Sequence, residues 1–265
     1  MAWALRQGAT EVNILAEHAA GMLARRAVGW TPPVYVWQVS GRMLQPAEPE
    51  PLPPPTPLAF AHAEFEPLIR EGGADPIVEH GVLAGEVDGL EVCRVVTDAY
   101  TDAVRLEVGV GTHDREAFQL LHGDRPTGEA LADVVRSVRE HRRAGADRHP
   151  LNLLAQERAL RARLIAAPGL IGASDVRPVA PPIARVNVKD AVPCVAQATI
   201  ASHRVTVVCS TGVDLDVVPF AVDAMAASRS SECLIVVPAR DALDIQHQLA
   251  AAAPGSIAIT PLGTP

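Results

Sequence analysis

PCVAQATIASHRVTVVCS, residues 193–210, opens the stretch of sequence that decides the fold. Its two apolar runs are separated by a short Ala-Ser-His segment, which is the spacing of a β-hairpin. Two alanine-rich segments of helical length follow, VVPFAVDAMAAS (217–228) and DALDIQHQLAAAA (241–253), and they alternate with the strand-like runs ECLIVVP (232–238) and SIAITPL (256–262). Apolar strands that alternate with helices predict a parallel sheet with helices on its faces. We therefore expect an α/β protein with a C-terminal parallel βαβαβ unit.

The loop at residues 210–216 follows the second of these strands, and ligands of parallel sheets usually lie at the carboxyl ends of strands. Its carboxylates, Asp214 and Asp216, would repel a phosphate at the start of the next helix, so a cation or a ligand hydroxyl or amine suits the loop better. Asp216 also has a structural interpretation, because it is placed to cap that helix. The candidate ligand-binding residues are Ser210, Thr211, Gly212, Asp214 and the single lysine of the chain, Lys189.

The N-terminal region predicts a helix followed by a strand. Apolar residues recur at helical spacing over residues 10–28, and VYVWQV (34–39) is typical of a strand. Residues 46–57 hold seven prolines in twelve positions, which predicts an extended linker. The expected organisation is an N-terminal helix and strand (1–45), the linker (46–57), an α+β part (58–170), an irregular connector (171–192) and the C-terminal α/β unit (193–265).

The α+β part contains the clearest hairpin signal, the Asp88-Gly89 turn between GVLAGEV (81–87) and LEVCRVV (90–96). VRLEVGV (104–110) continues with clean alternation, so the three runs predict an antiparallel meander with one wet or partly covered face. Helices are expected before this meander, over residues 64–71, and after it. The helices after it should begin at residues 112, 127 and 150.

The predicted order of elements between residues 64 and 121 is a helix, a three-stranded meander and a second helix. This order resembles the start of the PD-(D/E)XK nuclease core. That resemblance implies two carboxylates that hold Mg²⁺ and activate water for phosphodiester hydrolysis. Glu91 and Glu107 lie on the corresponding strands, but Val and Gly follow Glu107 where the family has a lysine. Pairing of the two glutamates with Arg94 or Arg105 on a sheet face is the structural alternative.

Basic residues gather between residues 134 and 165, where eight arginines stand against three acidic residues in a chain of net charge −8. This asymmetry is typical of a surface that binds nucleic acid or an acidic partner, but helices docked on the protein's own acidic surface give the same pattern. The arginines of this expected patch are Arg136, Arg139, Arg142, Arg143, Arg158 and Arg161. The richness in arginine, alanine and proline also suggests a GC-rich bacterial genome.

The composition excludes several classes of protein. No run of about 18 apolar residues is present and the first residues lack the pattern of a signal peptide, so we expect a soluble, cytoplasmic protein. The four cysteines occur singly within strand-like runs, which predicts buried reduced thiols and not a zinc site. Oligomeric state is not indicated by the sequence.

These observations favour a binding or regulatory module without a recognisable catalytic motif. Two alternatives stay open. The first is a divergent metal-dependent nuclease or phosphodiesterase that uses Glu91, Glu107 and Mg²⁺. The second is a small-molecule enzyme or sensor with its site at residues 210–216.

Overall fold

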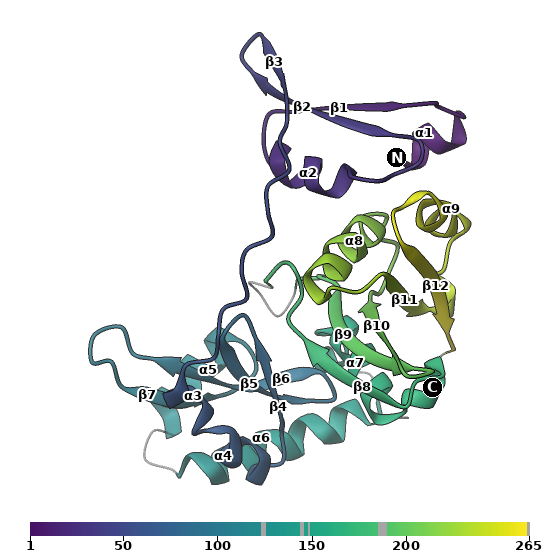
Figure 1. Ribbon diagram of the computed structural model, residues 1–265. Helices are drawn as coiled ribbons and strands as arrows, with labels where there is room; N and C mark the ends of the chain where they lie inside the picture. Colours follow the sequence, from purple (N-terminus) through teal and green to yellow (C-terminus); the bar gives the residue numbers. More distant parts are fainter. Residues whose placement is uncertain (123–125, 144–145, 148, 185–189, 264–265) are drawn as a thin grey trace. The chain divides into compact units, whose positions relative to one another are not determined.

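The computed structural model describes residues 1–122, 126–143, 146–147, 149–184 and 190–263 (Figure 1). Two compact units make up the chain. Unit 1 contains residues 1–54, residues 169–176 and the described residues from 195 onward, and unit 2 contains residues 55–168 and the described part of 177–194. The boundary after Pro54 falls within the proline-rich segment, and residues 47–59 contain no helix or strand. Helices together with three sheets confirm the expected α/β class.

The N-terminal part of unit 1 is a three-stranded sheet with a helix against one face. Its elements are α1 (Ala2–Arg6), β1 (Val12–Ala16), α2 (Ala20–Ala27), β2 (Val34–Ser40) and β3 (Met43–Pro46). β1 and β2 are parallel and are joined by α2, whereas β3 pairs antiparallel with β2. Ala16, Ala20, Ala24 and Val36 form the buried contact between α2 and the sheet. Because three of these four side chains are alanines, the helix can lie close to the strands.

The helix expected over residues 10–28 is wrong in its first half. Residues 12–16 form β1, and only residues 20–27 form a helix. Ile14 and Ala16 face α2, and their period of two was hidden because apolar residues of this segment also recur at helical spacing. Ala19, with φ of 54°, separates the two elements. Pairing of β1 with β2 therefore overrides the local pattern.

The C-terminal part of unit 1 is built on a five-stranded sheet with strand order β12-β11-β10-β9-β8. Its elements are β8 (Asp175–Val179), β9 (Cys194–Ile200), β10 (His203–Cys209), α8 (Val217–Ser228), β11 (Glu232–Pro238), the 3-10 turn η3 (Ala239–Asp241), α9 (Asp244–Ala252) and β12 (Ser256–Leu262). β10, β11 and β12 are parallel, with α8 and α9 as their connections, so the expected βαβαβ unit is confirmed. β8 was not expected, because it lies in the segment that was taken for an irregular connector.

The β9–β10 hairpin is also confirmed. Its two-residue turn, Ala201 and Ser202, has φ of 46° and 69°, the left-handed values that match the twist of two-residue hairpins.

Unit 2 contains a four-stranded antiparallel sheet in the order β4-β5-β6-β7 and several helices. Its elements are α3 (Phe60–Ala63), α4 (Glu66–Glu71), β4 (Asp75–Glu79), β5 (Val82–Val87), β6 (Leu90–Thr97), β7 (Val104–Val108), α5 (Thr112–His122), α6 (Thr127–Arg142), the 3-10 turn η1 (Pro150–Leu153) and α7 (Gln156–Ala166), and the 3-10 turn η2 (Pro168–Ile171) follows. Leu83, Leu90, Val92 and Leu131 are completely buried in its core. The expected meander is confirmed, and β4 extends it by one strand.

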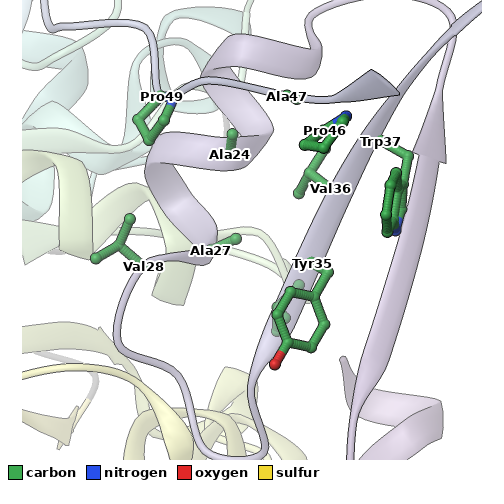
Figure 2. Close-up of a pocket in the computed structure, with 10 residues that line it drawn as sticks. Ala24, Ala27, Val28, Tyr35, Val36, Trp37, Pro46, Ala47 and Pro49 are labelled. Carbon is green, nitrogen blue, oxygen red and sulfur yellow. The ribbon is translucent and has the colours of Figure 1, made fainter. Parts of the chain in front are cut away.

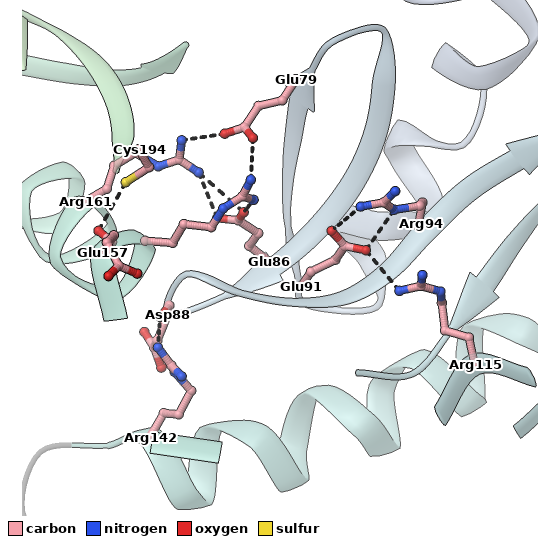
Figure 3. A network of polar contacts seen from close by, with 11 residues as sticks. Glu79, Glu86, Asp88, Glu91, Arg94, Arg115, Arg142, Glu157, Arg161 and Cys194 are labelled. Carbon is pink, nitrogen blue, oxygen red and sulfur yellow. Dashed lines mark hydrogen bonds and ion pairs between the residues drawn. The ribbon is translucent and has the colours of Figure 1, made fainter. Parts of the chain in front are cut away.

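The Asp88-Gly89 turn of this meander lies against the backbone of α7. A Cβ atom on Gly89 would come within 2.2 Å of the carbonyl carbon of Arg158, so only glycine fits there. The helix expected from residue 150 instead starts as η1, and α7 begins at Gln156 after Ala155 adopts φ of 48°. The turn and α7 together bring the arginines of α7 over the sheet (Figure 3).

Candidate ligand-binding pocket

A pocket of about 470 Å³ lies in unit 1, a size typical of small-molecule sites. Its wall comes from two sets of segments that are far apart in the sequence. The N-terminal set is Met1, Ala2, Trp3, Ile14, Met22, Leu23, Arg26, Ala27, Trp30 and Val34, and the C-terminal set is Leu215, Asp216, Pro219 and Leu249. Most of these side chains are apolar, two are indoles and two carry charge. The loop expected to bind a ligand therefore contributes Leu215 and Asp216 to this wall.

An ion-pair cluster beside the pocket holds α2 on α8. Asp223 is only 1 % exposed and accepts hydrogen bonds from Nε of Arg25 at 2.9 Å and from Nε of Arg26 at 2.7 Å. Arg25 also donates from Nη1 to the backbone oxygen of Glu50 at 2.6 Å. One buried carboxylate thus fixes two consecutive arginines, which makes it an anchor for the N-terminal part of the unit.

Arg26 is the charged residue of the pocket that sequence reasoning missed. Its Nη2 is buried and has no hydrogen-bond acceptor within the part of the chain that the structure describes. Its backbone oxygen accepts the indole N–H of Trp30 at 2.6 Å, so the donor of this buried indole is satisfied. Arg26 therefore adds a charged side chain to a largely apolar wall, and this side chain is already paired with Asp223. An Arg-Arg pair at the end of an amphipathic helix was the signal in the sequence.

The loop at residues 210–216 is held from behind by two polar side chains. Asp241, which is 8 % exposed, accepts the N–H of Gly212 at 2.8 Å. Gln246 is buried and donates to the backbone oxygen of Asp214 at 3.1 Å. Ser210 is itself buried, with its N–H bonded to Val236. Of the predicted ligand residues, Ser210, Thr211, Gly212 and Asp214 are not among the described residues that line the pocket, and Lys189 lies outside the described residues.

The capping hydrogen bond expected of Asp216 is made by Asp214 instead. Asp216 stands at the N-cap of α8, but its side chain makes no capping hydrogen bond. Asp214 Oδ1 accepts the N–H of Asp216 at 2.8 Å instead. Burial raises the pKa of Asp214, as does the nearby charge of Asp216, while the hydrogen bonds that Asp214 accepts from the backbone of Asp216 and Val217 lower it. Asp214 is therefore structural, and the exposed carboxylate of Asp216 is left at the pocket.

A second pocket, of about 300 Å³, lies between α2, β2 and residues 46–49 (Figure 2). Figure 2 shows Ala24 and Ala27 on α2 and Val36 on β2, with Tyr35 and Trp37 beside them. None of its described lining residues carries a charge. A site that orients a ligand normally has a few polar groups that converge on it. The larger pocket has these groups and is the better candidate.

The two predicted metal ligands of unit 2 are both paired with arginines, and Figure 3 shows Glu91 with Arg94 and Arg115. Glu91 is 4 % exposed and accepts a bidentate pair of hydrogen bonds from Arg94, both at 2.8 Å, and a third bond from Arg115 at 3.0 Å. Glu107 is bound by Arg105 at 2.8 Å and lies 3.7 Å from Nε of Arg115. Burial raises the pKa of Glu91, but the hydrogen bond and charge of Arg94 and the charge of Arg115 outweigh it and leave that pKa below its ordinary value.

Glu91 and Glu107 thus both lie close to Arg115. Their carboxylates bind this guanidinium and are not arranged around a metal ion. Within the described residues, no group of three or more His, Cys, Asp and Glu side chains is arranged to hold a metal. A small pocket of about 140 Å³ beside Glu91 is lined by Glu79, Arg94 and Arg158, which already form ion pairs. The geometry therefore favours the pairing with Arg94 and Arg105 that the sequence offered as the structural alternative, but each pair lies within one strand and Arg115 of α5 joins the two glutamates.

The expected basic patch does not form one exposed surface. Arg161, 1 % exposed, binds Glu79 at 2.6 Å and Glu86 at 3.1 Å, and the buried Arg158 binds the same two carboxylates. Arg142 is half-buried and donates to three backbone oxygens, those of Asp88, Leu151 and Leu154. Arg136, Arg139 and Arg143 are the exposed members of the patch, and Arg139 also bonds to the backbone of unit 2 at 2.6 Å. Three of the six arginines therefore serve the interior of unit 2.

The four cysteines are all buried and free, as expected. Burial raises the pKa of Cys93 and that of Cys233 to about 12, which makes both thiols poor nucleophiles. None of the described helices has the length and apolar character needed to cross a bilayer.

Comparisons with known proteins give no relative from which a function could be transferred. No protein-family model matches this chain, and neither the curated proteins nor the solved structures contain a match.

Proposed function

We propose that this protein is a binding or regulatory module that takes up a small, largely apolar molecule in the 470 Å³ pocket of unit 1. The observation that carries the proposal is one cavity whose wall combines indole and aliphatic side chains with two charged residues, Arg26 and Asp216. Apolar walls supply binding free energy, and a few polar groups fix the orientation of the ligand.

Two distant segments of the chain form the wall, so binding of a ligand can be coupled to the docking of one segment on the other. Residues 1–34 supply one side and residues 215–249 supply the other. A ligand that contacts both sides binds only while the N-terminal part is docked on α8 and α9. By mass action it stabilises that docked state, by about 2.7 kcal/mol when its concentration is a hundred times its Kd. The signal would thus be the docking of the first residues of the chain.

The test uses 8-anilinonaphthalene-1-sulfonate, an apolar fluorescent dye with one acidic group, titrated into the full chain. Met22 lines the pocket, so Met22→Trp should fill part of it and weaken dye binding at least about tenfold. Met43 is 60 % exposed on β3 and is not a lining residue, so Met43→Trp provides the matched control and should leave the affinity unchanged.

Equal weakening by both substitutions, or by neither, would contradict the proposal. Circular dichroism of both variants shows whether each one is folded. Thermal unfolding gives a second readout, because the dye should raise the midpoint of the wild-type chain and of Met43→Trp but not of Met22→Trp.

A further inference from the structure

The charges next to the pocket do not balance on the arginine side. Arg25 and Arg26 share the single carboxylate of Asp223, so the cluster carries one net positive charge. The additional contact of Arg25 is to the neutral backbone oxygen of Glu50, which leaves that charge in place. The unsatisfied donor of this cluster is Nη2 of Arg26. Arg26 is a lining residue, so a ligand carboxylate that binds its guanidinium would balance the excess positive charge.

The opposite charge lies on the loop side of the same pocket. No hydrogen bond or ion pair joins the carboxylate of Asp216 to another described residue, and its side chain does not cap α8. Asp214, two residues earlier, already accepts the backbone N–H there. Asp216 is therefore free to bind a cationic group, such as an ammonium.

We propose that the ligand is a small zwitterion of the α-amino acid class with an apolar side chain. The inference rests on the proposed function, because it names the ligand of the same pocket. The carboxylate of the ligand binds Arg26, its ammonium group binds Asp216, and its side chain lies among Leu23, Trp30 and Leu249. Such a ligand balances both charges at once.

Ligands with a single charge fit the same walls less well. An apolar carboxylate would satisfy Arg26 but place a second negative charge in a cavity that already holds Asp216. An apolar amine would satisfy Asp216 and leave the arginine cluster with its excess charge. Like charges brought together in a partly desolvated site cost affinity, so both classes should be rejected relative to the zwitterion.

Three probes with one phenyl ring separate these classes: L-phenylalanine, 3-phenylpropionate and 2-phenylethylamine. Isothermal titration calorimetry on the full chain should give L-phenylalanine the lowest Kd, at least about tenfold below each of the others. Equal affinity for all three probes would overturn the inference. Tighter binding of the carboxylate or of the amine would overturn it too.

Two substitutions should give crossed results. Asp216→Asn should weaken L-phenylalanine and 2-phenylethylamine about tenfold while leaving 3-phenylpropionate unchanged or tighter. Arg26→Gln should weaken L-phenylalanine and 3-phenylpropionate more than the amine, because loss of its ion pair with Asp223 also loosens the docked wall for every probe. Asp244, an exposed carboxylate at the start of α9 that does not line the pocket, provides the control as Asp244→Asn. Uniform weakening of all probes by Asp216→Asn would contradict the assignment of the ammonium.

Dye binding distinguishes failure of this inference from failure of the proposed function. If the dye binds wild type and is blocked by Met22→Trp while the three phenyl probes show no preference, the pocket is a ligand site and the zwitterion is wrong. If neither the dye nor any of the three phenyl probes binds the wild-type chain, the proposed function falls and the inference falls with it.

Discussion

Charged side chains are treated differently in the two units. In unit 2, Arg158 and Arg161 face Glu79 and Glu86, and each arginine contacts both carboxylates. In unit 1, two arginines share the single carboxylate of Asp223, and Asp216 on the wall of the pocket has no hydrogen-bond partner for its side chain among the described residues. Balanced buried charges maintain a fold, whereas unbalanced charges on the wall of a cavity are available to a ligand. This difference separates a structural network from a candidate site.

The largest effect is expected from breaking the balanced network. Glu86→Gln leaves Arg158 and Arg161 buried with one carboxylate between them, which should lower the free energy of unfolding of unit 2 by about 3–5 kcal/mol. Urea unfolding followed by circular dichroism measures this loss. Glu66→Gln removes an exposed pair with Arg70 and should cost less than about 1 kcal/mol. Similar costs for both substitutions would mean that the buried network does not stabilise the unit.

Breaking the cluster of unit 1 should cost less, because its arginines are partly exposed. Asp223→Asn should lower stability by about 2 kcal/mol and release the N-terminal part from α8. Limited proteolysis should then cut within the first 54 residues faster than in wild type. Glu48→Gln, at an exposed position of the same unit, is the control and should leave the cleavage rate unchanged. Equal protection in wild type and Asp223→Asn would contradict the anchoring role.

Substitutions of Asp214 and Asp216, two aspartates of one loop, should affect stability differently. Asp214→Ala removes the acceptor for the N–H of Asp216 and should cost about 1 kcal/mol, as loss of a helix cap does. Asp216→Ala should change stability by less than about 0.5 kcal/mol, since no bond to its side chain is lost. Thermal unfolding of the two variants compares them directly. The reverse order would mean that Asp216 is the structural residue.

The smallest effect is expected in the pH dependence of unit 2. The pKa of Glu91 is lowered below 4.5 in the folded state, so its ion pairs contribute stability above pH 4.5 and lose it as the pH falls through the folded pKa. Glu91→Gln should therefore make the fall of unfolding free energy below pH 4.5 shallower. Unfolding curves recorded between pH 3 and pH 6 test this. If the unfolding free energy of Glu91→Gln depends on pH in the same way as that of wild type, protonation of Glu91 is not coupled to unfolding.

The sequence predicted those parts of the fold whose patterns are local. The βαβαβ unit, the β9–β10 hairpin and the meander around Asp88-Gly89 follow from alternation and turn chemistry between neighbouring segments. β1 was missed because its apolar spacing fits both a strand and a helix. Pairing with β2, which the local sequence does not encode, decides between them.

Of the candidate site, the sequence indicated only the neighbourhood of one segment, because none of the predicted ligand-binding residues is among the described residues that line the pocket. The loop at residues 210–216 was found from its position after a parallel strand, and it contributes Leu215 and Asp216. Arg26 and Trp30 were missed because nothing local links them to a loop nearly 190 residues later. For the same reason, a count of charges along the chain suggested a basic patch where Arg158 and Arg161 in fact meet distant glutamates.

The contact between Arg25 and Asp223 also affects how the chain folds during its synthesis on the ribosome. These residues are 198 positions apart, and a ribosome that adds about 5–20 residues per second takes roughly 10–40 s to cover that distance. During this time the N-terminal sheet has left the ribosome without the helix on which it docks. Leu15, Tyr35 and Leu44 stay about half exposed or more even in the finished unit, so the nascent N-terminal part presents an apolar surface from the start. Chaperone binding during translation should therefore concentrate on the first 54 residues until α8 has emerged.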